Sequence, residues 1–287
     1  MNIEVTQTGG ACGAVVRGID LTEILDSEEV SNLHSHWLKH HVLVFPEQDI
    51  SDDDLLRFSS HFGVLSLDPY IESIDGYDHI VAMTRLADES GPIFAEAWHS
   101  DWSFKPTPPI GSCLRSIVIP PRGGHTSFID QQKALLTMPK HLRSRIEGKS
   151  ALHSARGAYA PEGVYGDRDK ASNRSIKVRT SKDARTVQEH PLIMSHPESG
   201  EEMLFGCFGY IVGIKGMTTE QGCDLLREIL EWQTRGEFRY DHEWEEKMVV
   251  LWDNRSVLHK ANGGYEGYDR ILHRTTIEHK TASNTCL

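Results

Sequence analysis

Short runs of apolar and β-branched residues recur along the chain, separated by polar segments rich in glycine, proline and serine. Runs of this kind, bounded by turn residues, are typical of β-strands. They predict strands over residues 14–16, 41–45, 79–83, 112–119, 203–205, 248–252 and 271–277. The turn residues 196–200, which follow the apolar run 192–194 and precede 203–205, predict a hairpin. The whole pattern predicts a sandwich or barrel of strands.

Three stretches show the helical spacing of apolar positions instead. They cover residues 27–40, 51–62 and 218–235. Ser51 is expected to cap the second stretch, because a serine oxygen accepts N–H bonds from the first turn of a helix. The three aspartates that follow it complement the positive end of that helix. We expect the helices to cover the outside of the sheets.

Residues 157–189 form the most polar stretch, with many charges and no sustained apolar period. Loops of this length in a compact domain are usually lids, binding loops or irregular surface segments. Two interpretations therefore stay open for this segment: a lid over an active site, or a surface loop with no role there.

The length of 287 residues is compatible with a single domain over 1–287, because large mixed and all-β barrels often fold as one unit. The 30 Lys and Arg against 42 Asp and Glu give a net charge of −12, which disfavours nucleic acid and membrane partners and favours a small molecule. The sequence has neither a secretory start nor a run of about 18 apolar residues, so we expect a cytoplasmic protein. Its five scattered cysteines form no Cys-x-x-Cys pair and are expected to be reduced thiols.

His99-Ser100-Asp101 is the only His-x-Asp triplet in a chain with 16 histidines. The aromatic-rich segment 97–104 around it predicts the end of a buried strand. Residues two apart on a strand point to the same face, so His99 and Asp101 could share a metal ion. A related triplet, His196-Pro197-Glu198, lies in a proline and glycine turn and is expected to be unrelated to a metal site.

His259 is the candidate for a third ligand, because it follows the apolar strand 248–252 and a polar turn. Two histidines and one carboxylate form the facial triad of non-haem Fe(II) oxygenases, which leaves coordination positions open for a co-substrate and O₂. A lone histidine at a strand end is more often a packed or hydrogen-bonded residue. His259 alone does not decide between the two interpretations.

Arg270 and Arg274 share one face of the last predicted strand. Both reach solvent, or both face the interior, where a buried guanidinium group needs an anionic partner. The alternation of side chains along a strand does not decide between these two orientations. An interior pair would suit a dicarboxylate, with one arginine holding the distal carboxylate. Thr126, just after the Gly123-Gly124 turn, is a further hydroxyl that could assist, although an ordinary strand threonine is the commoner case.

Four motifs, in this order and spacing, resemble the taurine and 2,4-dichlorophenoxyacetate dioxygenase family of Fe(II)/2-oxoglutarate enzymes. They are Trp98-His99-Ser100-Asp101, Gly123-Gly124-His125-Thr126, Trp252-Asp253-Asn254-Arg255 with His259, and Arg270-Ile271-Leu272-His273-Arg274. The resemblance spans nearly the whole chain. It implies a mainly β fold, with a double-stranded β-helix (jelly-roll) core and flanking helices.

The resemblance also implies roles for these residues. His99, Asp101 and His259 would bind Fe(II), and Arg270 with Thr126 would hold the distal carboxylate of 2-oxoglutarate. Arg274 would lie by its other carboxylate and the substrate. Such an enzyme converts 2-oxoglutarate and O₂ to succinate and CO₂ while it oxidises a substrate. Asn254 and Arg255 would support the turn that delivers His259.

The substrate is expected to be small, partly apolar and anionic, since Arg274 can pair with an anion and several aromatic residues flank the motifs. The candidate substrate-binding residues are Phe94, Glu96, Trp102, Phe208 and Tyr210. The alternative function is a non-catalytic jelly roll that holds zinc with the same ligands, or senses a dicarboxylate. Succinate formation would distinguish the two. The oligomeric state is not readable, although an enzyme of this kind can form a homo-oligomer.

Overall fold

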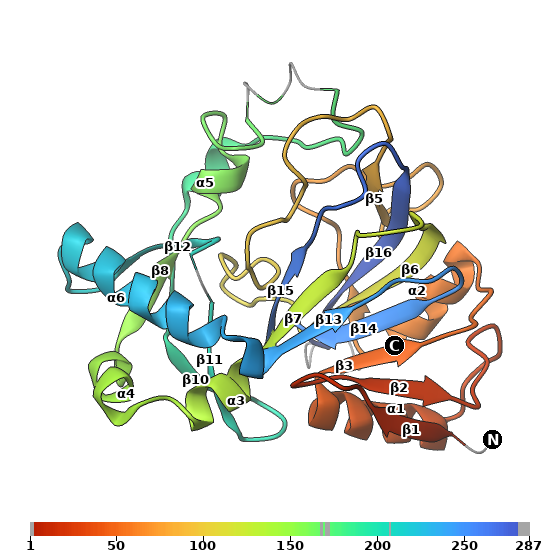
Figure 1. Ribbon diagram of the computed structural model, residues 1–287, viewed down its shortest axis with the longest axis horizontal. Coiled ribbons are helices and arrows are strands. Elements are labelled where there is room, and N and C mark those ends of the chain that lie inside the picture. The colour runs from red at the N-terminus through yellow and green to blue at the C-terminus, as the bar shows by residue number, and fades with distance from the viewer. Residues whose placement is uncertain (1–2, 167–168, 170–172, 207, 281–287) are drawn as a thin grey trace.

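The largest sheet contains eight strands in the order β1-β2-β3-β14-β6-β16-β4, with β5 also paired to β16. The computed structural model describes residues 3–166, 169, 173–206 and 208–280. The strands of this sheet are β1 Glu4–Gln7, β2 Ala14–Arg17, β3 Val42–Phe45, β4 Val64–Leu65, β5 Val81–Arg85, β6 Gly111–Val118, β14 Val249–Asp253 and β16 Arg270–Glu278. The mainly β architecture expected from the sequence is confirmed (Figure 1).

Three smaller sheets complete the strand content of the described residues, in the orders β13-β7-β15, β12-β8-β9 and β10-β11. Their strands are β7 Thr126–Asp130, β8 Ser150–His153, β9 Gln188–Pro191, β10 Ile193–Ser195, β11 Glu202–Leu204, β12 Ile211–Ile214, β13 Arg239–His242 and β15 Val257–Ala261. The β10–β11 pair is the hairpin that the sequence predicts. Phe128 of β7 and Val257 of β15 pack against residues of the large sheet, such as Trp252, so the functional side chains between these two sheets share one interior.

The central strand β14 has five buried residues in succession, which accounts for its continuous apolar run. Val249 and Leu251 pack into the cluster shared with helices α1 Ser27–His40 and α2 Asp52–Ser60. Val250 and Trp252 pack on the opposite face, toward β7 and β15. Because neighbouring side chains on a strand point to opposite faces, a layer on each side requires apolar residues at every position.

The predicted helices are present with small shifts at their ends. Helix α1 covers the predicted range, and Ser51 caps α2 by accepting a hydrogen bond from the backbone N–H of Asp54. The third is α6 Thr219–Gln233, which packs with α3 Gln131–Leu136 and α4 Lys140–Ile146 in a second core. Helices α3 and α4 are short, and the sequence pattern did not indicate them. No described helix combines the length and apolar character needed to cross a membrane.

The 157–189 segment is largely irregular where it is described. It begins within α5 Arg156–Tyr159, contains the short helix η2 Lys182–Arg185, and reaches the start of β9. Figure 1 shows this green segment at the same end of the molecule as the orange loops before β5. The two are joined by a backbone bridge between Ile71 and Val178.

Candidate active site

His99, Asp101 and His259 converge in the structure. Each offers one ligand atom, and the three atoms lie within 4.8 Å of one another. The Nε2 atoms of both histidines lie 3.7 Å from Oδ1 of Asp101, and all three side chains are buried. Among the described residues this is the only such group of His, Cys, Asp or Glu side chains. Two histidines and one carboxylate in this arrangement match the donor set of a non-haem Fe(II) site.

The prediction of a strand at His99 and Asp101 is wrong. His99 forms only an isolated bridge with His259, through backbone hydrogen bonds of 3.0 and 2.8 Å in the two directions. The chain then turns at Asp101, and the next residue, Trp102, has a φ of 46°. Pairing with β15 therefore brings the histidines together, and the turn, not strand alternation, directs the carboxylate toward them.

The electrostatics of the three groups favour a bound cation. Burial lowers the pKa of His99, and lowers that of His259 to about 3, so both rings are neutral at pH 7. Burial raises the pKa of Asp101, but Arg274 and the two histidines outweigh this effect and bring it to about 2. Nδ1 of His99 lies 2.8 Å from the carbonyl oxygen of Ala97, a contact that places the ring proton there and leaves the lone pair of Nε2 free for a metal.

A chain of buried hydrogen bonds fixes the carboxylate of Asp101. Ser112 on β6 donates to Oδ2 of Asp101 at 2.6 Å, and the Asn254 amide donates to Ser112 at 2.9 Å. The Ser100 hydroxyl donates to the backbone carbonyl of Asn254 at 2.6 Å. The turn after β14 is thus hydrogen-bonded to Ser100 directly and to Asp101 through Ser112. Ser112 carries no motif and was not indicated by the sequence.

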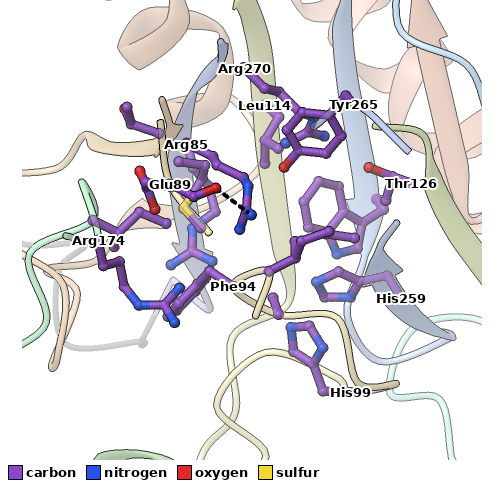
Figure 2. Close-up of a pocket in the computed structure, with 18 residues that line it drawn as sticks. Arg85, Glu89, Phe94, His99, Leu114, Thr126, Arg174, His259, Tyr265 and Arg270 are labelled. Carbon is purple, nitrogen blue, oxygen red and sulfur yellow. Dashed lines mark hydrogen bonds between the residues drawn. The ribbon is translucent and has the colours of Figure 1, made fainter. Parts of the chain in front are cut away.

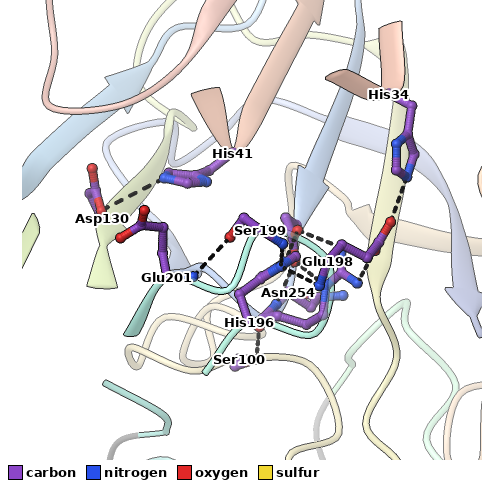
Figure 3. Close-up of polar contacts among 11 residues, drawn as sticks. His34, His41, Ser100, Asp130, His196, Glu198, Ser199, Glu201 and Asn254 are labelled. Atoms are coloured by element: carbon purple, nitrogen blue, oxygen red, sulfur yellow. Dashed lines mark hydrogen bonds and ion pairs between the residues drawn. The ribbon is translucent and has the colours of Figure 1, made fainter. Parts of the chain in front are cut away.

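A second polar network lies behind this turn, and Figure 3 shows its members around His196 and Glu198. Asp253 accepts hydrogen bonds from the Arg255 guanidinium at 2.8 and 2.7 Å and lies 3.0 Å from His196 Nε2. Arg255 also pairs with Glu198, which in turn lies 3.0 Å from His34. The His196-Pro197-Glu198 triplet therefore anchors the turn that leads to β15. It lies outside the His99 group, as predicted.

Arg270 lies in a cavity of about 60 Å³ that extends from His99 and His259 to Thr126 (Figure 2). Its guanidinium is buried, and its Nε donates to the carbonyl oxygen of Gly124 at 3.0 Å. No ion pair involves Arg270 within the described ranges, and burial lowers its pKa. Thr126 is oriented by Trp244, whose Nε1 donates to its hydroxyl at 3.0 Å. A buried arginine without a counter-ion, beside a hydroxyl, is suited to an anionic ligand.

Arg274 faces the same interior, so the outward-facing alternative for both arginines is excluded. Its surroundings differ from those of Arg270. Nη2 donates to Asp68 at 2.6 Å, and Nη1 lies 3.7 Å from Asp101. Burial acts to lower the pKa of Arg274, but these two carboxylates outweigh it and raise the pKa above its ordinary value. Asp68 lies outside every motif in the sequence.

A second cavity, of about 80 Å³, adjoins the first, since Phe94, Ala95, His99 and Arg274 line both. Its aromatic lining consists of Phe94, Trp102, Tyr159, Tyr165 and Tyr210. Three of these were expected from the sequence, whereas Tyr159 and Tyr165 come from the 157–189 segment. The other two expected residues, Glu96 and Phe208, are exposed and line neither cavity. Their proximity in sequence to the site did not translate into side chains that face it.

The His99, Asp101 and His259 group lies between the large sheet and the β13-β7-β15 sheet, next to the buried and unpaired Arg270. Together these features define a non-haem iron oxygenase site with room for a carboxylate co-substrate. The family model described as "Taurine catabolism dioxygenase TauD, TfdA family" matches residues 4–276. The chain belongs to this family, and it is a 2-oxoglutarate-dependent non-haem iron dioxygenase that uses Fe(II), 2-oxoglutarate and O₂.

Individual relatives agree with this assignment over almost the full length. The chain is 32% identical to the alpha-ketoglutarate-dependent 2,4-dichlorophenoxyacetate dioxygenase of Cupriavidus pinatubonensis, over 92% of this chain and 93% of that protein. It is 31% identical to an alkylsulfatase of Acinetobacter baylyi, over 96% and 84% of the two chains. A taurine dioxygenase from Burkholderia xenovorans superposes with a TM-score of 0.79 at 29% identity, over 97% of this chain and 90% of that one. Dioxygenases of this type have a jelly-roll core, which confirms the predicted fold class.

Proposed function

We propose that this dioxygenase hydroxylates a small organic substrate that is partly apolar and carries an anionic group, with cleavage where the hydroxylated carbon bears a heteroatom. The observation that carries the proposal is a second cavity at His99, next to the one that contains Arg270, in which aromatic side chains and the guanidinium-bearing Arg274 line the same space. Named substrates of relatives, such as 2,4-dichlorophenoxyacetate and sulfate esters, combine the same two features.

The proposed division of labour follows the two cavities. His99, Asp101 and His259 hold Fe(II), which supplies the activation of O₂ while 2-oxoglutarate is converted to succinate and CO₂. Arg270 and Thr126 bind the distal carboxylate of 2-oxoglutarate. Arg274, which lines both cavities, lies between this co-substrate and the substrate. The five aromatic residues that line the second cavity, called the aromatic wall below, hold the apolar body of the substrate and keep water away from the reacting carbon.

We further propose that residues 157–189 act as a lid. Tyr165 accepts a hydrogen bond from the backbone N–H of Ala95 at 3.1 Å, next to Phe94 in the wall. Arg174 and Ile176 line the first cavity, while Tyr159 lines the second. These contacts of the described residues support the proposal, because both cavities include side chains from this segment. Limited proteolysis tests this: protection of 157–189 by Fe(II), 2-oxoglutarate and substrate is expected, and equal cutting with and without them would contradict it.

A turnover screen tests the reaction and the substrate class together. The Fe(II)-loaded protein is incubated in air with 2-oxoglutarate and matched sets of sulfonates, aryloxy acids, sulfate esters, amino acids and their neutral analogues. Succinate release above the substrate-free rate is expected for anions with an apolar body. His99→Ala should lose the weak visible band that Fe(II) protein gains on adding 2-oxoglutarate without oxygen. Stimulation by neutral molecules alone would contradict the anionic substrate, and absence of the band in the loaded wild type would contradict the function.

A further inference from the structure

Asp68 is a buried carboxylate that faces the guanidinium group of Arg274. Its Oδ2 accepts the 2.6 Å hydrogen bond from Arg274, and the two side chains are only 4% and 7% exposed. Its Oδ1 accepts hydrogen bonds from the backbone N–H groups of Tyr70 and Ile71 at 2.8 and 2.7 Å. Because both oxygens are engaged, Asp68 is held in place against Arg274, which lines both cavities, and is not a mobile surface residue.

Asp68 lies shortly after strand β4, which pairs with the end of β16. Strand β4 runs antiparallel to the end of β16, with Val64 opposite Glu278. The backbone N–H of Ser66 continues this pairing by donating to the carbonyl of Thr276 at 2.9 Å. The pairing ends there, because Val81 of β5 and Leu114 of β6 lie opposite Arg274 on its two sides. Asp68 therefore reaches Arg274 from the irregular segment that follows β4, through its side chain.

The positive charge of Arg274 is therefore matched before any ligand arrives. Asp68 and Asp101 lie on its two terminal nitrogens, at 2.6 and 3.7 Å. The third nitrogen, Nε, is buried and has no hydrogen-bond partner among the described residues. The group can still donate a hydrogen bond toward a ligand, but an anion placed there also meets the negative charge of Asp68. The attraction between a charge and a neutralised pair is much weaker than that between two single charges.

We propose that Asp68 is a specificity-determining residue that competes with the anionic group of the substrate for Arg274. This inference rests on the proposed function, because it concerns the anion that the second cavity would receive. An anion that binds beside Arg274 shares the guanidinium with Asp68, so it gains less affinity than an unpaired arginine would give. Selection between substrates then depends mainly on how their apolar body fits the aromatic wall of Phe94, Trp102 and Tyr210.

The test compares charged and neutral ligands of the same shape. Isothermal titration calorimetry measures the Kd of two ligand pairs: phenoxyacetate with phenoxyacetamide, and benzenesulfonate with benzenesulfonamide. Each Kd is measured twice, once without oxygen on protein loaded with Fe(II) and 2-oxoglutarate, and once on metal-free protein. Asp68→Asn keeps the oxygen that accepts from Tyr70 and Ile71 but removes the charge. We expect it to lower the Kd of the anions about tenfold or more and to change that of the neutral partners less than about twofold.

Glu89→Gln is the matched control. Like Asp68, Glu89 is a buried carboxylate that accepts two backbone hydrogen bonds, from the N–H groups of Leu86 and Ser175, both at 3.0 Å. No ion pair joins it to an arginine in the described part of the chain, so its ratio of anion to neutral Kd should stay at the wild-type value. Asp68→Ala, which removes the charge and the backbone contacts, should shift the ratio in the direction of Asp68→Asn.

Three outcomes would overturn the inference. The ratio of anion Kd to neutral-ligand Kd is unchanged in Asp68→Asn, or it shifts equally in Glu89→Gln, or no anion binds measurably to either the wild type or Asp68→Asn. Failure of the proposed function is distinguishable, because it shows as a missing 2-oxoglutarate band in the wild type. The ratio measured on the metal-free protein decides the role of Asp68 in that case as well.

Discussion

Arg270 and Arg274 lie four residues apart on the same face of β16, and their electrostatic surroundings are opposite. Arg270 has a carbonyl oxygen as its hydrogen-bond partner, and burial lowers its pKa. Arg274 lies against two carboxylates, which raise its pKa. A buried cation without a partner destabilises the empty protein and is retained where a ligand supplies the missing charge. The comparison identifies Arg270 as the residue prepared for an external anion, whereas the charge of Arg274 is already matched inside the protein before a ligand binds.

The two cavities differ in the charge that they offer to a ligand. The cavity around Arg270 has apolar walls, including Leu114, Ile176 and Trp252, and its Arg270 has no carboxylate partner among the described residues. The second cavity also has apolar walls, but Arg274, which lines it, is already paired with Asp68. Apolar contact contributes to binding in both cavities, whereas an unpaired cation is available only in the first.

The largest expected effect follows from removing Arg274. In Arg274→Met two buried carboxylates, Asp68 and Asp101, lose their shared cation. Stranding buried charges in this way typically costs about 3–5 kcal/mol of unfolding free energy. Urea denaturation of the metal-free protein at pH 7 measures it. The double variant Arg274→Met with Asp68→Asn should recover part of the loss, because only one unpaired carboxylate remains. A loss below about 1 kcal/mol would show that Arg274 is not neutralised internally.

Removing Arg270 is expected to affect the ligand more than the fold. Arg270→Met should weaken 2-oxoglutarate binding about 100-fold, because the distal carboxylate loses its charge-assisted hydrogen bonds. The titration of the visible band under anaerobic conditions measures the Kd. Arg85→Met is the control: this arginine lines the same cavity, but its N–H groups donate to the backbone carbonyls of Gly91 and Glu89 at 2.9 and 3.0 Å. Equal weakening in both variants would remove the distinction between them.

Much of the fold was accessible from the sequence, because its elements carry local signals. Helix α1 has a regular apolar face, and Ser51 with the following aspartates marks the start of α2. The buried run of β14 and the 196–200 turn are equally local. The short helices α3 and α4 were not indicated, because they span only 6 and 7 residues and are held by contacts with α6 that are distant in sequence.

In the site, too, features with a local sequence signal could be predicted and features that depend on distant contacts could not. The identity of the three metal-binding candidates could be predicted, but the turn at Asp101 and the bridge between His99 and His259 could not, since they depend on pairing across the molecule. Strand alternation could not decide whether Arg270 and Arg274 face inward. Asp68 was not indicated because it belongs to no motif, and its contact with Arg274 joins residues 206 positions apart, which no local pattern reveals.

The smallest effect separates the two arginines most sharply, and it concerns the empty protein. Arg270→Met removes a buried cation that has no carboxylate partner, so the metal-free variant should be as stable as the wild type or more stable by about 1 kcal/mol. Saturating 2-oxoglutarate with a metal should stabilise the wild type, since a ligand that binds only the folded state shifts the unfolding equilibrium, and should stabilise the variant far less. Paired urea denaturations with and without ligand measure both quantities. If the empty Arg270→Met protein loses as much stability as Arg274→Met, the charge of Arg270 is already compensated within the fold, and the assignment of this arginine to an external carboxylate is wrong.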